Sequence, residues 1–224
     1  LILREGWGEP KEFAITRKIV VIPTLDWEMK NGNIAYIELY NFNAAAPQLF
    51  YQAAANALLQ GTQGVILDLR NNPGGFLDVA TNLAGWFLDK GDIVVRERYR
   101  DGEEELLRAN NNSALRDIPV VILVNGGSAS ASEILAGALR DNRGTKLIGE
   151  KTFGKGTVQE VVTLSNGASL KISIAEGLTP KGTLINEKGL TPDVLVKFTE
   201  EDEKNKRDPQ LEKALQVITA EING

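Results

Sequence analysis

Two stretches of consecutive apolar residues, each followed by a glycine-containing loop and a helical pattern, constrain the fold more than any other feature. The first is GVILDLR at residues 64–70, followed by the loop NNPGG at 71–75 and a helix expected to run to about residue 88. The second is PVVILV at residues 119–124, followed by NGGS at 125–128 and a helix over 131–140. Apolar runs without polar alternation are typical of strands buried on both faces, as in parallel sheets. The repeated order of strand, loop and helix predicts an α/β fold.

Other patterns extend this framework. We expect strands at residues 13–23, 33–40 and 146–149, and helices at 47–60 and 209–222. After residue 156 the hydrophobic period changes to two, which predicts strands at 157–164, 169–174 and 193–197. Asn166 and Gly167 form a hairpin signal between the first two of these strands. The acidic stretch 199–206 is expected to be exposed, and the β-rich part to be an addition to the α/β core.

The chain contains no histidine and no cysteine among its 224 residues. This excludes a histidine general base, a thiol nucleophile, a disulfide and any zinc site built from these side chains. A catalytic base must then be Lys, Asp, Glu, Tyr or a metal-bound water. Asp68, Asp78 and Asp117 are scattered, so no carboxylate pair is spaced for a metal or for glycoside cleavage, and we expect no metal and no cofactor.

Charge and hydropathy argue against two classes of partner, nucleic acid and the membrane interior. The 25 basic residues against 30 acidic ones give a net charge of -5, which argues against a nucleic-acid partner. No apolar run approaches the roughly 18 residues that a membrane span needs. The length suits one large domain, with or without a small appendage.

The loop before the second predicted helix carries Ser130, three residues before Glu133. A serine at a helix N-terminus lies among free backbone amides, which can stabilise an alkoxide or a tetrahedral oxyanion. The same spacing also fits a capping box, with Ser at the N-cap and Glu at N3. From the pattern alone, capping is the more common use of such a serine, and a nucleophilic role stays the alternative.

Two further loops are candidates for chemistry. The segment GEKTFGKGT at 149–157 nearly matches the phosphate-binding P-loop, but Gly156 replaces the required Ser or Thr and a strand follows instead of a helix. Nucleotide binding is therefore disfavoured. Lys155 between two glycines is either an exposed charge or, if burial removes its water, a general base. Gly74 and Gly75 in the first loop offer backbone amides to a cavity or form an ordinary turn.

Without histidine and cysteine, the surviving scheme for acyl transfer is a serine nucleophile with a lysine base. Ser130 lies 25 residues before Lys155, and Gln159 lies four residues after Lys155. Segments 65–75, 121–134, 147–159 and 189–194 together resemble the carboxyl-terminal processing (tail-specific) proteases of peptidase family S41. The resemblance covers roughly residues 12–218.

This resemblance implies a crotonase/ClpP-like core and a set of site roles. It makes Ser130 the nucleophile, Lys155 the general base and Gln159 the residue that orients the base. The oxyanion hole falls on the amides of Ala131 and Gly75, with Gly74 as the near neighbour. The resemblance gives no attacking role to the flanking serines, Ser128 and Ser132.

The resemblance also predicts the domain organisation. Residues 1–23 resemble the end of a PDZ domain, 24–200 the protease core, and 201–224 form a C-terminal acidic segment and helix. No complete PDZ domain is expected. The implied partners are protein or peptide substrates with C-terminal tails, and an oligomer or a regulatory partner is compatible with it. The implied location is the cell envelope, outside the cytoplasm.

Two other functions remain open at this stage. A catalytically silent peptide-binding or scaffold domain of the same fold would bind peptides without cutting them. A crotonase-like enzyme would bind an acyl-CoA, because that fold also builds oxyanion holes from glycine amides. The pairing of Ser130 with Lys155 weighs against the second.

Overall fold

The computed structural model describes residue 16 and residues 22–110 and 113–224. Most of the strand predicted over 13–23, and most of the predicted segment 1–23, lies outside the described residues. In the described part of the chain, no helix has the length and apolar character needed to cross a membrane.

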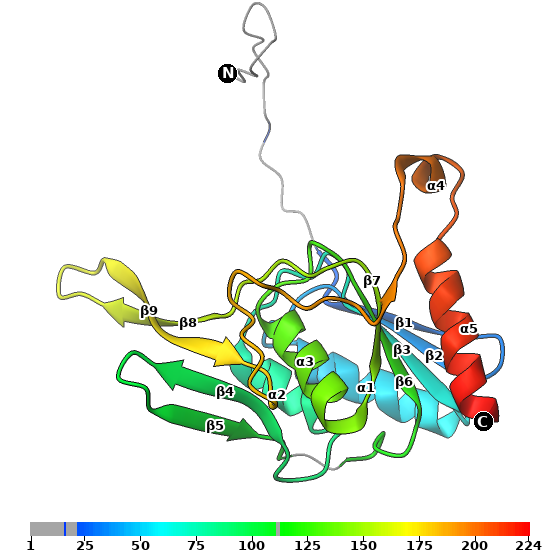
Figure 1. Ribbon diagram of the computed structural model, residues 1–224, viewed down its shortest axis with the longest axis horizontal. Helices are drawn as coiled ribbons and strands as arrows, with labels where there is room; N and C mark the ends of the chain where they lie inside the picture. The colour runs from blue at the N-terminus through cyan, green and yellow to red at the C-terminus, as the bar shows by residue number, and fades with distance from the viewer. Residues whose placement is uncertain (1–15, 17–21, 111–112) are drawn as a thin grey trace, which may run out of the picture.

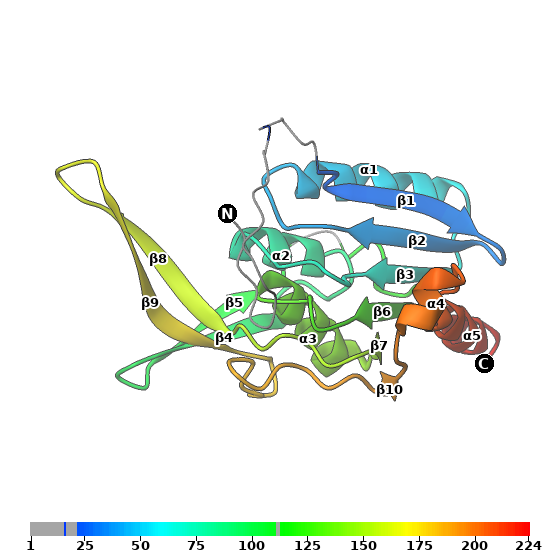
Figure 2. The ribbon, with the colours of Figure 1, turned by 90° about the horizontal axis from the view of Figure 1, so that it is seen from above.

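The core is a six-stranded sheet (Figure 2). Only β1 and β2 pair antiparallel; the other neighbouring strands run parallel, as the uninterrupted apolar runs predicted. In spatial order the strands are β1 (Leu25–Lys30), β2 (Ile34–Leu39), β3 (Gly64–Asp68), β6 (Val120–Val124), β7 (Lys146–Gly149) and β10 (Val194–Leu195).

Helices cover both faces of this sheet. Along β3, Val65 and Leu67 belong to the larger core, which includes α1 (Ala46–Leu59), α2 (Leu77–Ala84) and α3 (Ala131–Arg143). Ile66 points to the opposite face, where it packs with α5 (Pro209–Asn223). Because successive side chains of a strand alternate between faces, a fully apolar strand needs a helix layer on each side. The α/β fold class is confirmed.

A second sheet has the order β5-β4-β9-β8 and is antiparallel. Its strands are β4 (Ile93–Tyr99), β5 (Glu104–Arg108), β8 (Thr157–Thr163) and β9 (Ser169–Leu178). The β8–β9 hairpin projects from the body of the molecule as a two-stranded ribbon (Figure 1). Strands β8 and β9 of this sheet were predicted from the change of hydrophobic period, whereas the third strand predicted from it, at 193–197, is β10 of the first sheet.

Four elements were not predicted from the sequence: β1, β4, β5 and α4 (Glu200–Lys204). The helix predicted to reach residue 88 ends at Ala84, because Gly85 breaks it and the next residues turn to bury Trp86 and Phe87 against Phe50. The helix predicted over 131–140 runs on to Arg143, where a left-handed Gly144 caps it.

Arg70 joins the end of β3 to the start of α5. Its guanidinium group donates hydrogen bonds to Asp68 at 2.6–3.0 Å and to Asp208 at 2.8 and 2.9 Å. The Asp68 carboxylate is buried and also accepts a 2.7 Å hydrogen bond from the Tyr36 hydroxyl. Asp208 caps α5 by accepting from the Leu211 amide. This network fixes the terminal helix to the strand that leads into the first glycine loop.

We expect Arg70→Leu to lower the free energy of unfolding by about 2–4 kcal/mol, because it leaves two carboxylates without their counter-charge, one of them buried. Chemical denaturation measures the change. The control is Arg116→Leu, whose ion pairs with Asp89 and Asp117 lie at the surface and should matter little. Equal effects of the two substitutions would contradict the role given to the network.

The same network predicts a pH dependence of stability. Burial by itself raises the pKa of Asp208, but hydrogen bonds from Arg70 and the Leu211 amide outweigh it and hold the pKa below its usual range. Its contribution is complete above the carboxyl pKa of the unfolded chain, about 3.9, and is lost as the pH falls through the lower folded value. Asp208→Asn keeps the capping oxygen but cannot titrate. As the pH is lowered below about 4, the free energy of unfolding of Asp208→Asn should therefore fall less steeply than that of the wild type. Denaturation measured at a series of acidic pH values tests this, and parallel pH curves for the two proteins would refute it.

Candidate active site

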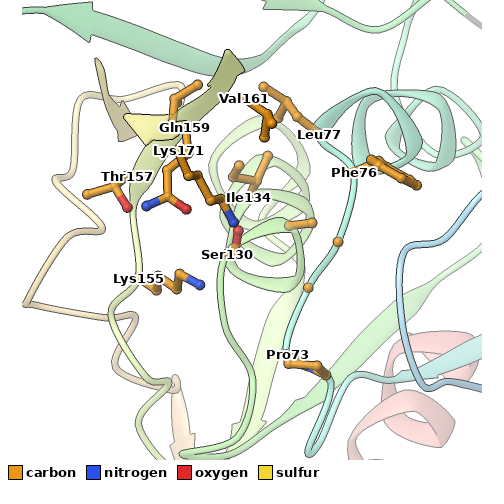
Figure 3. Close-up of a pocket in the computed structure, with 14 residues that line it drawn as sticks. Pro73, Phe76, Leu77, Ser130, Ile134, Lys155, Thr157, Gln159, Val161 and Lys171 are labelled. Atoms are coloured by element: carbon orange, nitrogen blue, oxygen red, sulfur yellow. The ribbon is translucent and has the colours of Figure 1, made fainter. Parts of the chain in front are cut away.

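The three loops singled out from the sequence surround one cavity of about 520 Å³ (Figure 3). The loop after β3 contributes residues 73–75, the start of α3 contributes Ser130 and Ala131, and the loop after β7 contributes Lys155. Strand β8 supplies Gln159. The structure thus brings all six predicted site residues to one place, at the carboxyl ends of β3, β6 and β7, where ligands of parallel sheets collect. The wall is completed by Phe76, Leu77, Ile134, Thr157, Val158, Val161 and Lys171.

Ser130 precedes α3 in a backbone conformation that side chains rarely adopt, with φ 56° and ψ -116°. Such strain persists only where the surrounding structure enforces it, and it is concentrated at functional sites. The neighbouring serines are occupied elsewhere. Buried Ser128 donates to the Leu69 carbonyl at 2.7 Å, and buried Ser132 donates to the Asn72 carbonyl at 2.9 Å. Of these three serines, only Ser130 lines the cavity.

Glu133 connects the loop of the predicted nucleophile to the loop of the predicted base. Its side chain is fully buried on the first turn of α3. One oxygen accepts from the amides of Ser130 at 3.0 Å and Lys155 at 2.9 Å. The other accepts from the Gly154 amide at 2.8 Å and the Thr152 hydroxyl at 2.5 Å. The predicted capping box between Ser130 and Glu133 is therefore present, and the Glu133 carboxylate also binds a second loop.

Two backbone amides are available for an oxyanion. Within the described residues, neither the Gly75 amide nor the Ala131 amide has a hydrogen-bond acceptor, and both residues line the cavity. The Gly74 amide differs, because it donates to Asn72 Oδ1 at 2.9 Å. The geometry therefore favours Gly75 over Gly74 as the partner of Ala131, in the order that the sequence suggested.

Glycine is required at both positions of the first loop. A Cβ on Gly74 would lie 2.8 Å from Ser130 Cβ and 2.9 Å from the Ala131 nitrogen, and one on Gly75 would lie 2.3 Å from the Phe42 carbonyl oxygen. Both residues also have positive φ values, 94° and 151°. The absence of side chains at these glycines lets the first loop pack against the Ser130–Ala131 peptide. The unpaired amides of Gly75 and Ala131 therefore face the same cavity.

Lys155 and Gln159 face the same cavity but are less tightly held. Both residues are exposed, and the structure has no hydrogen bond from either side chain to Ser130 or between them. The Gln159 amide group donates to Ser173 Oγ across the hairpin at 3.4 Å. In Figure 3 the Lys155 side chain points toward Ser130. Apo sites often show such loose contacts, which tighten when substrate binds.

The backbone around Lys155, in contrast, is fixed. A Cβ on Gly154 or on Gly156 would lie 2.9 Å or 2.5 Å from backbone nitrogens of the segment 185–189. Thr157 then opens β8, as predicted, so the phosphate-binding alternative lacks its helix. Among the described residues, no group of three or more acidic side chains is arranged to hold a metal ion.

Sequence reasoning missed two contributors. Asn72 is fully buried, and besides holding the Gly74 amide it donates to the Leu39 carbonyl at 2.6 Å. The sequence pattern predicts only a loop at Asn72, although an Asn two residues before a glycine pair is a common way to fix a turn. Lys171 comes from β9, and only the hairpin register brings it to the cavity.

Comparison with known proteins defines the class of this chain. A model of peptidase family S41 matches residues 33–196. A carboxyl-terminal-processing protease of Synechocystis sp. is 43% identical over 203 residues, which cover 87% of this chain and 46% of that protein. The carboxy-terminal processing protease CtpA of Bacillus subtilis is 37% identical over 183 residues, covering 82% of this chain and 39% of that protein.

The chain belongs to peptidase family S41, which confirms the resemblance inferred from its segments. It spans less than half the length of these curated relatives. Among solved structures, the photosystem II D1 C-terminal processing protease matches with a TM-score of 0.73 and 36% identity, over 80% of this chain and 49% of that one.

Replacing Glu133 with Gln should disturb both loops at once. Gln offers one acceptor oxygen where the carboxylate uses two, so two of the four donors face an NH₂ group. We expect the free energy of unfolding to fall by about 2 kcal/mol or more, since each unsatisfied buried group costs about 1–3 kcal/mol. Labelling of Ser130 by a serine-reactive fluorophosphonate should also slow. Glu103→Gln, at an exposed carboxylate, is the control, and a Glu133→Gln protein as stable and reactive as this control would contradict the assignment.

Proposed function

We propose that this chain is the core of a serine endopeptidase that cleaves protein or peptide substrates near their C-terminus with a Ser/Lys dyad. The observation that carries the proposal is the convergence of Ser130, Lys155 and two unoccupied backbone amides on one cavity. Membership of peptidase family S41 supports a peptidase, and the Synechocystis and Bacillus subtilis relatives are both named for C-terminal processing.

The proposed chemistry begins with neutral Lys155, whose Nζ takes the proton from Ser130 Oγ as that oxygen attacks the substrate carbonyl carbon. The developing oxyanion accepts hydrogen bonds from the amides of Gly75 and Ala131. Collapse of this intermediate breaks the peptide C–N bond, and the Lys155 ammonium group returns the proton to the leaving amine. Water then attacks the acyl-enzyme with Lys155 again as base, which restores Ser130.

Strand β8 supports a simple mode of substrate binding. It is the edge strand of its sheet, and four of its residues line the cavity. An edge strand presents unpaired backbone groups to which an extended peptide can add, with little demand on side chains. A peptide bound there would also cover exposed Lys155, and loss of water favours the neutral form of an amine.

Two further parts of the proposal rest on the family resemblance alone. They are a location in the cell envelope, outside the cytoplasm, and the role of Gln159 in orienting the neutral Lys155 amine. The first does not affect the chemistry. In the second, the Gln159 Oε1 atom would accept a hydrogen bond from the amine, because its Nε2 donates to Ser173 Oγ.

The test is cleavage of casein at mildly alkaline pH, where more of the lysine is neutral. We expect cleavage by the wild type and a loss of at least about 100-fold in Ser130→Ala and in Lys155→Ala, because nucleophile and base act as one unit. Lys151→Ala is the matched control, since Lys151 is an exposed lysine of the same loop that does not line the cavity. Folding of all four proteins is checked by circular dichroism.

Other outcomes separate the alternatives. Cleavage that survives in Ser130→Ala would refute the assignment of Ser130 as the nucleophile. A folded wild-type chain that binds peptides, cuts none and is not labelled at Ser130 by a fluorophosphonate would favour the silent binding domain. Specific binding of an acyl-CoA would favour the crotonase-like alternative.

A further inference from the structure

The candidate active site has an uneven charge distribution. Among the described residues, its cavity is lined by two lysines, Lys155 and Lys171, and by no aspartate or glutamate. This is unusual in a chain whose net charge is -5. The proposed mechanism uses Lys155 as its base and assigns no role to Lys171.

Lys171 reaches the cavity through the register of the β8–β9 hairpin. It pairs with Val161, and the next pair on that face of the ribbon is Gln159 with Ser173. Glu160 pairs with Ile172 and therefore belongs to the opposite face. In Figure 3 the ammonium end of Lys171 points toward Ser130 from the side of the hairpin.

The Lys171 ammonium group has no structural use. Within the described residues it forms no ion pair and no hydrogen bond, whereas Arg98 on the same sheet pairs with Glu176. The apolar side chains of Leu77, from α2, and Ile134, from α3, lie across the cavity from the hairpin, and Val161 lies beside Lys171 as its cross-strand partner. A ligand that fits all of these groups is an extended peptide with an apolar side chain and a carboxylate close together.

We propose that Lys171 binds a substrate carboxylate next to the scissile bond and so selects the substrates of this site. The inference rests on the proposed peptidase function and names its substrate class. The carboxylate is either the terminal α-carboxylate of the substrate or the side chain of an Asp or Glu. An ammonium–carboxylate contact is a charge-assisted hydrogen bond, and it strengthens where a bound peptide excludes water.

Paired peptides test the proposal. One pair differs only in a C-terminal carboxylate or amide, and the other only in an Asp or Asn beside the cleaved bond. The wild type should cleave the charged member of one pair with a kcat/KM about five- to tenfold higher, a ratio expected for a partly exposed charge pair. The pair that responds identifies the source of the carboxylate.

The ratio should fall to about one in Lys171→Gln and should decrease with added salt in the wild type. Lys197→Gln is the matched control, because it removes the same charge from an exposed lysine outside the cavity and should keep the ratio. A wild type that prefers neither charged peptide overturns the proposal, as does a preference that survives in Lys171→Gln. Loss of all cleavage in Lys171→Gln with activity retained in Lys155→Ala also overturns it, because Lys171 would then be the base.

A binding measurement separates this inference from the proposed function. Fluorescence anisotropy of the labelled peptides with Ser130→Ala needs no turnover. Tighter binding of a charged peptide that is lost in Ser130→Ala/Lys171→Gln supports the carboxylate site, even if the wild type cuts nothing. Equal affinities for the charged and neutral peptides overturn the carboxylate site, even if the wild type is an active peptidase.

Discussion

The buried carboxylate of Glu133 is the interaction on which the candidate site depends. Burying a carboxylate is costly unless its oxygens are fully bonded, and here they accept from four donors on two loops. Those loops follow different strands, β6 and β7, so no local rule of sequence brings Ser130 near Lys155. The Glu133 side chain holds the two loops at a fixed separation, because moving either loop would break hydrogen bonds to a buried carboxylate.

A second group of contacts fixes the amides that face the cavity. The Gly74 amide donates a hydrogen bond to the Asn72 side chain. The glycine pair packs against Phe42 on one side and against the Ser130–Ala131 peptide on the other. The Ala131 amide is unpaired because it belongs to the first turn of α3, and the Gly75 amide is unpaired in an exposed loop position that faces the same cavity. The loop contacts fix both amides, so their orientation would need no change if an oxyanion formed between them.

The sequence predicted the parts of this structure that are determined locally. Uninterrupted apolar runs predicted β3 and β6, and the change of period predicted the β8–β9 hairpin. Strands β4 and β5 were missed because charged residues interrupt their apolar positions, as in Arg96, Glu97 and Arg98, and only pairing reveals them. The six candidate site residues were predicted from the absence of histidine and cysteine and from the family resemblance. Lys171 was not found, because its place depends on hairpin register and carries no signal in the local pattern.

The two halves of the site differ in how firmly they are built. The proposed nucleophile, Ser130, and the proposed oxyanion amides belong to loops packed against the core, whereas Gln159 and Lys171 come from a ribbon that projects from the body of the molecule (Figure 1). A ribbon with so few contacts to the body cannot hold a side chain as closely as the loops around Glu133 do. In the mechanism proposed here, a peptide added along β8 would both cover Lys155 and fix the ribbon over Ser130. Substrate binding would then complete the base and the carboxylate contact together, which links the selection of a substrate to its cleavage.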